Sequence, residues 1–359
     1  MKTVVVGLSG GVDSSVAAYL LKKQGYNVIG LFMLNWEETD ANGNCTAEQD
    51  FEDVKRVANK VGIPYYTVNY AKEYRERVFS YFLSEYEKGY TPNPDVMCNK
   101  EIKFGPFLEH ALSLGADYIA TGHYCKRVDE DGKVYLYKSF DKNKDQTYFL
   151  NQLNQQQLCK TLFPLADIDK TEVRKIAKEL GLITAEKKDS TGICFIGERN
   201  FRQFLKNFLP AKKGQIKDLQ GNVVGEHDGV MYYTIGQRRG LNIGGKNGYE
   251  SDRWFVVDKD VKQNVLYVNC GECEEMYSSA CIVTEFNWIT DELTEDFDAC
   301  VKLRYRQPDQ ETKVEVIDKT TLKLTFKQRQ RAVTVGQFAV LYDENGKCYG
   351  GGRINELIK

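Results

Sequence analysis

The stretch from Val4 to Ser15 reads Val-Val-Val-Gly-Leu-Ser-Gly-Gly-Val-Asp-Ser-Ser and decides the fold class. Its β-branched apolar start is typical of a buried parallel strand, and a glycine-rich turn follows. Apolar residues then recur at helical spacing until Gly25, where a helix C-cap is expected. The amides of the turn and the positive end of the helix dipole point to one place, which suits an anion such as phosphate.

The residues of the turn indicate a phosphate-binding loop and not merely a connection between strand and helix. Gly10 and Gly11 let the backbone approach a phosphate without an intervening Cβ, and Ser9 and Ser14 add hydroxyl donors. The turn is not the G-x-x-x-x-G-K-S/T loop, because no lysine follows the glycines, and it is not G-x-G-x-x-G. Residues 9–14 resemble the S-G-G-x-D-S pyrophosphate loop of N-type ATP pyrophosphatases. Those enzymes cleave ATP between the α and β phosphates and attach AMP to a substrate oxygen.

Composition sets wide limits on the class of protein. The chain has 359 residues, enough for about two to three domains. Its 42% hydrophobic and 28% charged content is ordinary for a soluble globular protein, and its net charge of −2 means that any nucleic-acid surface must be local. Met1-Lys2 leads directly into the first strand, and no apolar run is long enough for a membrane span. We therefore expect a cytoplasmic protein without a membrane partner.

Strands and helices alternate in the first half of the chain. The expected strands are 4–6, 28–33, 65–68 and 117–121, and the expected helices are 46–61, 72–88, 100–114 and 171–180. Two prolines in Thr91-Pro-Asn-Pro-Asp95 predict an extended loop there. This alternation predicts an α/β domain with a doubly wound parallel sheet over residues 1–198, whose ligands lie at the carboxyl ends of the strands.

The pattern changes near residue 198. Residues 199–217 hold six basic and no acidic residues, with Phe201, Phe204 and Phe208 interleaved, which favours an RNA-contacting surface over an ordinary solvated face. From about residue 276 the pattern alternates as short strands do, which predicts a small barrel or sandwich. We therefore expect a central basic, β-rich domain over 199–272 and a C-terminal β-barrel domain over 273–359.

The ten cysteines raise the question of thiol chemistry. A disulfide framework is not expected in the reducing cytosol. Cys98 follows the proline-stiffened loop, three residues after Asp95, and Cys194 lies between two glycines close to the basic stretch, whose charge favours a thiolate. On the residues alone, these two are not separated from the other eight. Cys270 and Cys273 have the spacing of half a zinc site, but no second pair follows, so we interpret them as structural.

Longer motifs extend the resemblance to the whole chain. They are Leu31-Phe-Met-Leu-Asn-Trp36, Thr91-Pro-Asn-Pro-Asp-Val-Met-Cys-Asn-Lys-Glu-Ile-Lys-Phe104, Ala120-Thr-Gly-His-Tyr124, Lys144-Asp-Gln-Thr-Tyr148, Ser190-Thr-Gly-Ile-Cys-Phe-Ile-Gly-Glu-Arg199, Tyr233-Thr-Ile-Gly-Gln-Arg-Arg-Gly240 and Arg304-Tyr305. With the loop at 9–14, the chain resembles the bacterial tRNA-specific 2-thiouridylases. The resemblance implies an adenine nucleotide alpha hydrolase-like catalytic domain and two tRNA-binding domains. It implies ATP-dependent 2-thiolation of the wobble uridine, through adenylation of uracil O2 and sulfur transfer from a cysteine persulfide.

The same resemblance implies roles for particular residues. ATP would be bound by Gly7, Leu8, Ser9, Gly10, Gly11, Val12, Asp13, Ser14, Met33 and Gly122. The target uracil would be held by Asn93, Pro94 and Asp95, and the tRNA contacted by His123, Lys144, Asp145, Gln146, Arg304, Tyr305 and Gln337. Cys98 would be the nucleophile and Cys194 the persulfide carrier, with Asp95 as a third catalytic residue.

The implied partners are the tRNA anticodon arm, Mg²⁺ with ATP, and a persulfide donor such as a cysteine desulfurase or a sulfur-relay protein. Three alternatives stay open. The loop would also suit an enzyme that joins ammonia or an amino acid to an adenylated carbonyl, and the chain would also suit an RNA-binding or sulfur-relay protein without catalysis. Asp95, Cys98 and Cys194 would also offer ligands to an iron–sulfur cluster.

Overall fold

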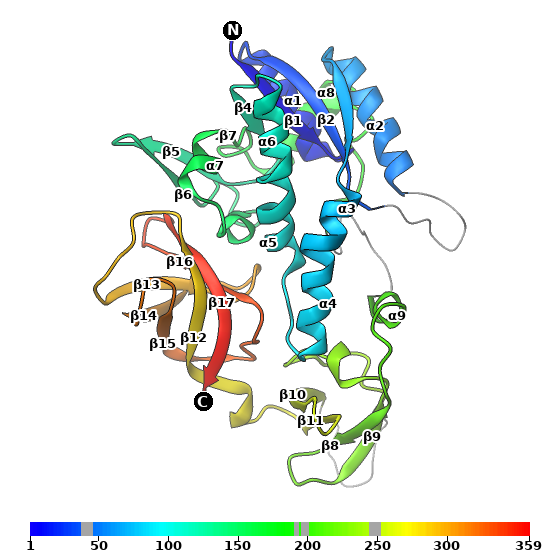
Figure 1. Cartoon of the computed structure of the whole chain (residues 1–359), viewed down its shortest axis with the longest axis vertical. Helices are drawn as coiled ribbons and strands as arrows, with labels where there is room; N and C mark the ends of the chain where they lie inside the picture. The colour runs from blue at the N-terminus through cyan, green and yellow to red at the C-terminus, as the bar shows by residue number, and fades with distance from the viewer. Residues whose placement is uncertain (37–45, 190–193, 195–200, 244–252) are drawn as a thin grey trace.

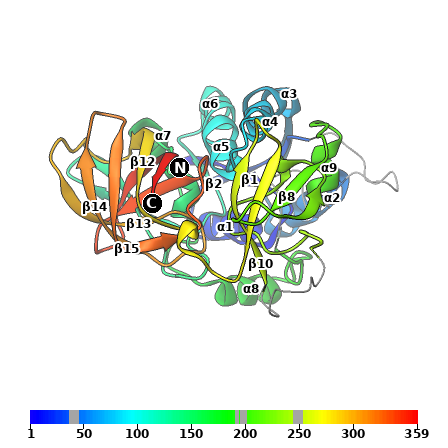
Figure 2. The ribbon, with the colours of Figure 1, turned by 90° about the horizontal axis from the view of Figure 1, so that it is seen from below.

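The computed structural model describes residues 1–36, 46–189, 194, 201–243 and 253–359. Figure 1 shows three parts: an α/β unit at the top, a barrel at the lower left and a small sheet at the bottom right. Seen from below, the barrel and the small sheet lie on opposite sides of the molecule (Figure 2). In the described part of the chain, no helix combines the length and the apolar character that crossing a membrane requires.

The α/β unit is built on a five-stranded parallel sheet with the order β3-β2-β1-β4-β7. The strands are β1 (Thr3–Leu8), β2 (Asn27–Leu34), β3 (Tyr65–Asn69), β4 (Tyr118–Ala120) and β7 (Thr161–Leu162). Val4 of β1 pairs with Val28 on one side and with Tyr118 on the other. After β1 the chain adds β2 and β3 on one side of this strand, and it later adds β4 and β7 on the other side. The carboxyl end of β1 is therefore a topological switch point, where ligands of such sheets bind.

Helices cover both faces of this sheet, which confirms the doubly wound prediction. One face packs on α1 (Val12–Lys23), α2 (Thr46–Val61) and α8 (Lys170–Glu179). The other packs on α6 (Pro106–Ser113) and on the helical segments before it. Successive side chains of β1 point to opposite faces of the sheet. Val4 and Val6 therefore pack in the core on the side of α1, α2 and α8, and Val5 packs in the core on the side of α6.

The extended loop predicted over residues 91–95 is wrong at Pro94 and Asp95, which begin helix α5 (Pro94–Cys98). Asn93 caps this helix by accepting a hydrogen bond from the Val96 amide at 3.2 Å. Proline is compatible with the first helical position because the amide there has no partner within the helix. The proline motif thus directs Cys98 to the end of a short, capped helix.

The two helices expected over 72–88 and 100–114 are interrupted by π-helical segments. The first runs through α3 (Ala71–Glu73), the π segment η1 (Tyr74–Phe79) and α4 (Ser80–Glu87). The second begins with the π segment η2 (Asn99–Lys103), breaks near Gly105 and continues as α6. Such π segments are rare and are frequent at functional sites. Both of them flank Cys98.

The central part is a four-stranded sheet of order β10-β11-β8-β9, made of β8 (Gly214–Lys217), β9 (Val223–His227), β10 (Trp254–Asp260) and β11 (Val265–Cys270). Helix α9 (Phe201–Lys206) precedes it. The Phe204 ring is buried, and its centroid lies 6.1 Å from that of Trp36 and 5.8 Å from that of Phe79. Phe208 lies 4.8 Å from Phe79. Phe204 is therefore a core residue, and the partly buried Phe208 packs against the same core. These two rings do not support the prediction of an RNA surface over 199–217, which stays a prediction.

The C-terminal part is a closed barrel of order β12-β15-β14-β13-β16-β17, which settles the choice between barrel and sandwich. Its strands are β12 (Tyr277–Trp288), β13 (Phe297–Lys302), β14 (Gln310–Val316), β15 (Leu322–Arg331), β16 (Phe338–Tyr342) and β17 (Cys348–Ile358). The remaining elements are β5 (Lys126–Glu130), β6 (Lys133–Tyr137), α7 (Gln155–Cys159) and the 3₁₀ turns η3 (Thr147–Leu150), η4 (Val230–Tyr232) and η5 (Glu274–Met276).

Candidate active site

The glycine turn after β1 forms a compact loop at the N-terminus of α1. The Ser9 amide donates to the Ser14 hydroxyl at 3.2 Å, and the hydroxyls of Ser14 and Ser15 donate to the Gly11 carbonyl at 3.2 and 2.7 Å. Gly10 adopts a φ of +72°, which favours glycine. The loop and the helix N-terminus together present backbone amides and a positive dipole to an anion.

Two further residues predicted to bind ATP lie against this loop. A Cβ added to Gly122 would lie 2.7 Å from the Ser14 amide nitrogen, so the turn after β4 touches the first turn of α1. The Met33 side chain reaches to 3.4 Å from where a Cβ on Gly7 would stand. The structure therefore gathers these predicted residues around the loop. The Tyr124 hydroxyl, 111 positions along the chain, donates to the Asp13 carboxylate there at 2.8 Å.

Three cations converge on Asp189 beside this loop. Its carboxylate pairs with Lys144, with Lys170 at 2.8 Å and with Arg174 at 2.9 Å, and Lys170 also bonds Asp13 at 2.6 Å. Burial favours the protonated form of Asp189, but the hydrogen bonds from Lys144 and Lys170 outweigh it and lower its pKa to about 2. The network links the first turn of α1 to the segment that leads to Cys194. It also provides positive charge next to the glycine loop.

The sulfurs of Cys98 and Cys194 lie in contact, 3.5 Å apart, although 96 positions separate them in the chain. Cys98 ends α5 and is fully buried. Two side chains hold Cys194 in place: the Asp95 carboxylate accepts from its amide at 3.0 Å, and the Tyr74 hydroxyl donates to its carbonyl at 2.8 Å. A covalent disulfide has sulfurs about 2.05 Å apart, so the pair is present as two thiol groups in contact.

Lys103 is a member of this site that the sequence analysis missed. Its ammonium donates to the Cys194 sulfur and lies close to Cys98 and Asp95. At the 3.6-residue period of an α-helix, a residue five positions after Cys98 turns away from it. The π segment η2, in which the Phe104 amide bonds the Asn99 carbonyl at 2.9 Å, brings the two onto one side. Only its place in the motif that contains Cys98 could have indicated Lys103.

The electrostatics separate the two cysteines. Burial raises the pKa of the Cys98 thiol. The hydrogen bond that Cys98 donates and the nearby Lys103 charge lower the pKa of Cys194. Burial also raises the pKa of Asp95, against the hydrogen bond from the Cys194 amide. Cys194 is therefore the more acidic thiol of the pair, and Cys98 is the less acidic one.

The barrel meets the catalytic unit at the loop that carries the predicted uracil-binding residues. The Gln337 side chain donates to the carbonyls of Thr91 and Pro92 at 2.8 and 3.2 Å and accepts from Asn93 at 3.4 Å. Arg304 donates to the Thr334 hydroxyl at 3.1 Å and to the Ala332 carbonyl. The Tyr305 ring lies 4.4 Å from that of Phe149. The structure thus brings Asn93, Gln337, Arg304 and Tyr305 to one junction.

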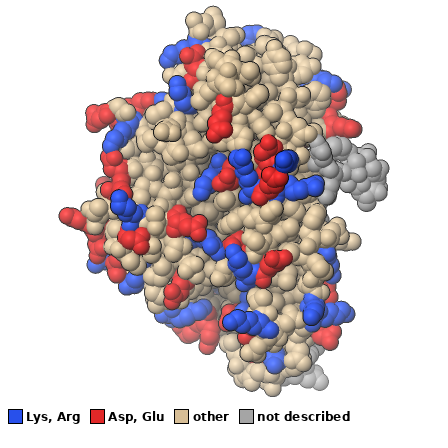
Figure 3. All heavy atoms as spheres, in the orientation of Figure 1, with Lys and Arg blue, Asp and Glu red and all other residues tan. Residues whose placement is uncertain are grey.

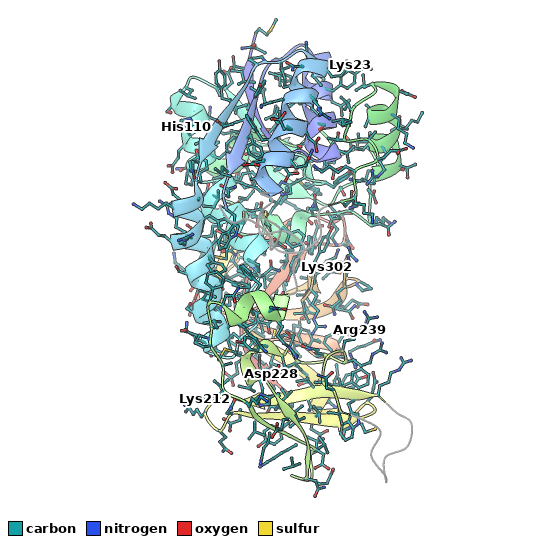
Figure 4. The ribbon with its side chains drawn as sticks, turned by 90° about the vertical axis from the view of Figure 1, so that its right-hand side faces the viewer. Lys23, His110, Lys212, Asp228, Arg239 and Lys302 are labelled. Carbon is teal, nitrogen blue, oxygen red and sulfur yellow. The ribbon has the colours of Figure 1, made fainter. Side chains whose placement is uncertain are left out.

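Other residues predicted to contact tRNA use their side chains internally. Asp145 is 4% exposed, accepts from the Ser139 amide at 3.1 Å and lies 3.8 Å from Lys302 of the barrel, which Figure 4 places at mid-height of the molecule. Gln146 accepts from the Tyr124 amide at 3.0 Å, and Lys144 pairs with Asp189. Their contacts with tRNA stay predictions. Asp145 also holds the barrel against the catalytic unit.

His123 is buried as well. Its Nδ1 lies 2.8 Å from the Thr121 hydroxyl, and burial together with the Lys103 charge places its pKa well below the ordinary value. The imidazole is therefore neutral at physiological pH. Its predicted contact with tRNA stays a prediction too.

The cysteine pair does not fit an iron–sulfur cluster as it is arranged. The two sulfurs touch each other, and one oxygen of Asp95 is occupied by the Cys194 amide, so the three groups do not surround a space. Within the described ranges, no group of three or more histidine, cysteine, aspartate or glutamate side chains is arranged to hold a metal ion. The arrangement fits thiol chemistry, and we derive no step through a cluster.

Three family models match consecutive parts of the chain. Residues 2–198 match the tRNA methyl transferase HUP domain, residues 202–270 the tRNA methyl transferase PRC-barrel domain, and residues 278–354 the aminomethyltransferase beta-barrel domain. Together these models cover nearly all of the chain.

Curated relatives match over the full length. The tRNA-specific 2-thiouridylase MnmA of Bacillus cytotoxicus is 56% identical over 99% of this chain and 95% of that protein. That of Oceanobacillus iheyensis is 57% identical with the same coverage. Among solved structures, the U34-tRNA thiolase NcsA from Methanococcus maripaludis with its 4Fe-4S cluster is 20% identical, with a TM-score of 0.35 over 58% of this chain and 65% of that chain. On the identity and coverage of the curated relatives, the chain belongs to the tRNA-specific 2-thiouridylase family.

Proposed function

We propose that this protein is a tRNA-uridine 2-sulfurtransferase that uses ATP to adenylate the O2 atom of the wobble uridine and replaces that oxygen with sulfur from a persulfide on Cys194. The observation that supports this most is the contact between the Cys98 and Cys194 sulfurs at 3.5 Å. The reaction of an adenylating enzyme that transfers no sulfur does not require two thiols in contact with unequal pKa values. A sulfur-transfer enzyme needs such a pair.

Activation of the base comes first. Uracil O2 attacks the α phosphate of ATP, the bond between the α and β phosphates breaks, and pyrophosphate leaves. The amides of Gly10 and Gly11 would receive this anion at the N-terminus of α1. Mg²⁺ bound with ATP would neutralise the departing charge. The Asp13 carboxylate, whose Oδ1 accepts from Tyr124 and Lys170, would offer it the other oxygen. Lys170, bonded to Asp13 at 2.6 Å, keeps that carboxylate oriented toward the loop.

Sulfur transfer follows. The terminal sulfur of the Cys194 persulfide attacks C2, and AMP leaves with the former O2 atom. The Cys98 sulfur then attacks the inner sulfur of Cys194, and the Cys98 proton passes to the thiouracil that is released. The bond between the two persulfide sulfurs breaks, its electron pair stays with the sulfur on C2, and a Cys98–Cys194 disulfide forms. Thiol exchange with a cellular dithiol or thiol reductant restores both cysteines. Asp95 and Tyr74 hold Cys194 within reach of Cys98 throughout.

The tRNA surface is local under this proposal. Acidic and basic side chains are interspersed over the face seen in Figure 3, so no overall field attracts RNA there. The junction of Asn93, Gln337, Arg304 and Tyr305 lies beside the cysteine helix and would hold the flipped base and its neighbours. The basic stretches 199–217 and 301–331 would contact phosphates, which makes binding salt-dependent. In Figure 4, Lys212 and Arg239 mark the central unit at the lower end of the molecule.

The domain division at 198/199 and 272/273, a cytoplasmic location and a persulfide donor such as a cysteine desulfurase or a sulfur-relay protein are parts of the same proposal. The end of the α/β unit before α9 and the start of the barrel at β12 support the division.

The test is a thiolation assay on unmodified tRNA with ATP, Mg²⁺ and a persulfide donor. Thiolated tRNA migrates slowly in a gel that contains an organomercurial. We expect retarded tRNA only with ATP, none with the Cys194→Ser variant, and normal retardation with the control Cys159→Ser, which changes a cysteine on α7. An active Cys194→Ser enzyme would refute the persulfide assignment. Pyrophosphate release that depends on ammonia instead of a sulfur source would support the amidating alternative.

A further inference from the structure

We propose that Lys103 is a further catalytic residue of this site, which holds the Cys194 sulfur as the anion that takes up the sulfur atom from the donor. The inference deepens the proposed function and rests on the assignment of Cys194 as the persulfide carrier. The residue is placed by η2, the π segment that directly follows the Cys98 helix.

The contacts of Lys103 are specific to the reacting atoms. The side chain is partly buried, and its ammonium donates to the Cys194 sulfur, to which Cys98 also donates at 3.5 Å. The Cys194 sulfur therefore receives two donors, whereas Lys103 acts on Cys98 through its charge. Charge-assisted hydrogen bonds of this kind favour the ionised form of the acceptor.

All the titratable groups around the ammonium are consistent with this role. Asp95 on α5 is the neighbouring carboxylate, and burial raises its pKa, which limits its competition for the ammonium. Tyr74 on η1 stays protonated because burial raises its pKa, with smaller contributions from the two cysteines. His123, after β4, stays neutral because burial lowers its pKa, helped by Lys103 itself. The Cys194 thiolate is thus the acceptor for the cation.

The role follows from the chemistry of sulfur uptake. The Cys194 thiolate attacks the outer sulfur of the donor persulfide, a new S–S bond forms on Cys194, and the donor's S–S bond breaks. The donor's inner sulfur leaves as a thiolate. Only the ionised thiol is a competent nucleophile, and an ordinary cysteine with a pKa near 8.5 is only a few per cent ionised at pH 7. Lys103 raises that fraction and then balances the charge of the persulfide anion that remains.

The experiment measures ionisation directly. Each cysteine of the full-length protein is alkylated with iodoacetamide between pH 5 and 10, and the peptides that contain Cys98 and Cys194 are quantified by mass spectrometry. In the wild type, Cys194 should react with a midpoint below that of an ordinary thiol and below that of Cys98. Lys103→Met, which keeps the chain length and removes the charge, should lower the Cys194 rate at pH 7 about tenfold and raise its midpoint. Lys103→Arg should restore both.

The matched control is Lys100→Met, which removes an exposed lysine from the same π segment and should leave the profile unchanged. An unchanged Cys194 profile in a folded Lys103→Met protein would overturn the proposal. If that variant does not fold, the wild-type titration still decides, because a Cys194 midpoint above that of Cys98 excludes the role. The alkylation uses neither ATP nor tRNA. If the thiolation assay fails while the pH profile of Cys194 alkylation is as expected, the result counts against the proposed function. It does not count against the effect of Lys103 on the ionisation of Cys194.

Discussion

The substitution Gly10→Ala tests whether the glycine turn is the anion site. Gly10 has a φ of +72°, and a Cβ placed on it would lie 2.6 Å from the Asp50 carbonyl oxygen and 2.9 Å from the Asp50 Cα, both in the backbone of α2. Ordinary contact begins near 3.4 Å, so the loop and α2 must separate by about 0.8 Å. The left-handed backbone of alanine adds about 1–2 kcal/mol of strain.

Gly25 offers a matched control at the opposite end of α1. Its φ is +88°, and a Cβ there meets nothing within 4 Å. Gly25→Ala therefore carries the same backbone strain without the collision. Gly25→Ala should lose about 1–2 kcal/mol of unfolding free energy. Gly10→Ala should lose more than this, because of the collision, and should also displace the amides of the loop.

The functional effect follows from the displacement. A misplacement of about 1 Å at a catalytic group costs on the order of 100-fold in rate. We expect Gly10→Ala to weaken ATP binding at least tenfold by isothermal titration calorimetry and to slow tRNA thiolation by roughly 100-fold, with Gly25→Ala close to the wild type in both. A Gly10→Ala protein that binds ATP as Gly25→Ala does would refute the assignment of this loop.

Three further predictions concern the surroundings of the site. Asp189→Asn should cost about 1 kcal/mol at pH 7: the drop in pKa from 3.8 to about 2 corresponds to about 2.4 kcal/mol, which solvent screening of this partly exposed group reduces. Because the pKa of Asp189 is lower in the folded state, this contribution to stability is present above about pH 4 and is lost as the pH falls toward 2. The unfolding curves of the variant and the wild type should therefore differ at neutral pH and converge in acid. Curves that coincide at pH 7 would contradict the prediction. Tyr74→Phe removes the hydroxyl that donates to the Cys194 carbonyl and should lower the free energy of unfolding in urea by about 1–2 kcal/mol. Thiolation should be slower, while the rate of ATP binding stays unchanged. Equal thiolation rates in variant and wild type would show that this hydrogen bond does not position Cys194. Phe204→Ala should cost about 3–5 kcal/mol, whereas Phe140→Ala, at a ring that is 67% exposed, should change stability by about 0.5 kcal/mol or less. Normal stability with weakened tRNA binding in Phe204→Ala would restore the interpretation of that ring as part of an RNA surface.

Sequence patterns alone predict the doubly wound sheet and the glycine loop at the start of α1, and they narrow the C-terminal part to a barrel or a sandwich. These features are carried by local signals: β-branched runs, glycine turns, capping residues and alternation of period two, each of which acts over a few neighbouring residues. Local signals failed where a rare backbone geometry intervened. Pro94 was read as a break although it begins a helix, and two continuous helices were expected where the chain forms π segments.

Which of the cysteines lie in contact, and which groups surround them, depends on the folded structure. Cys98 and Cys194 are 96 positions apart, and their contact depends on α5, η1 and the sheet packing in one arrangement, which no local pattern encodes. The position of Lys103 also depends on the fold, because a π-helical turn brings its side chain toward the two cysteines. Phe204 lies in a stretch of basic residues, and only the folded structure shows that its ring is buried in the core. Burial and proximity set the acidity of these groups, and both are properties of the folded chain.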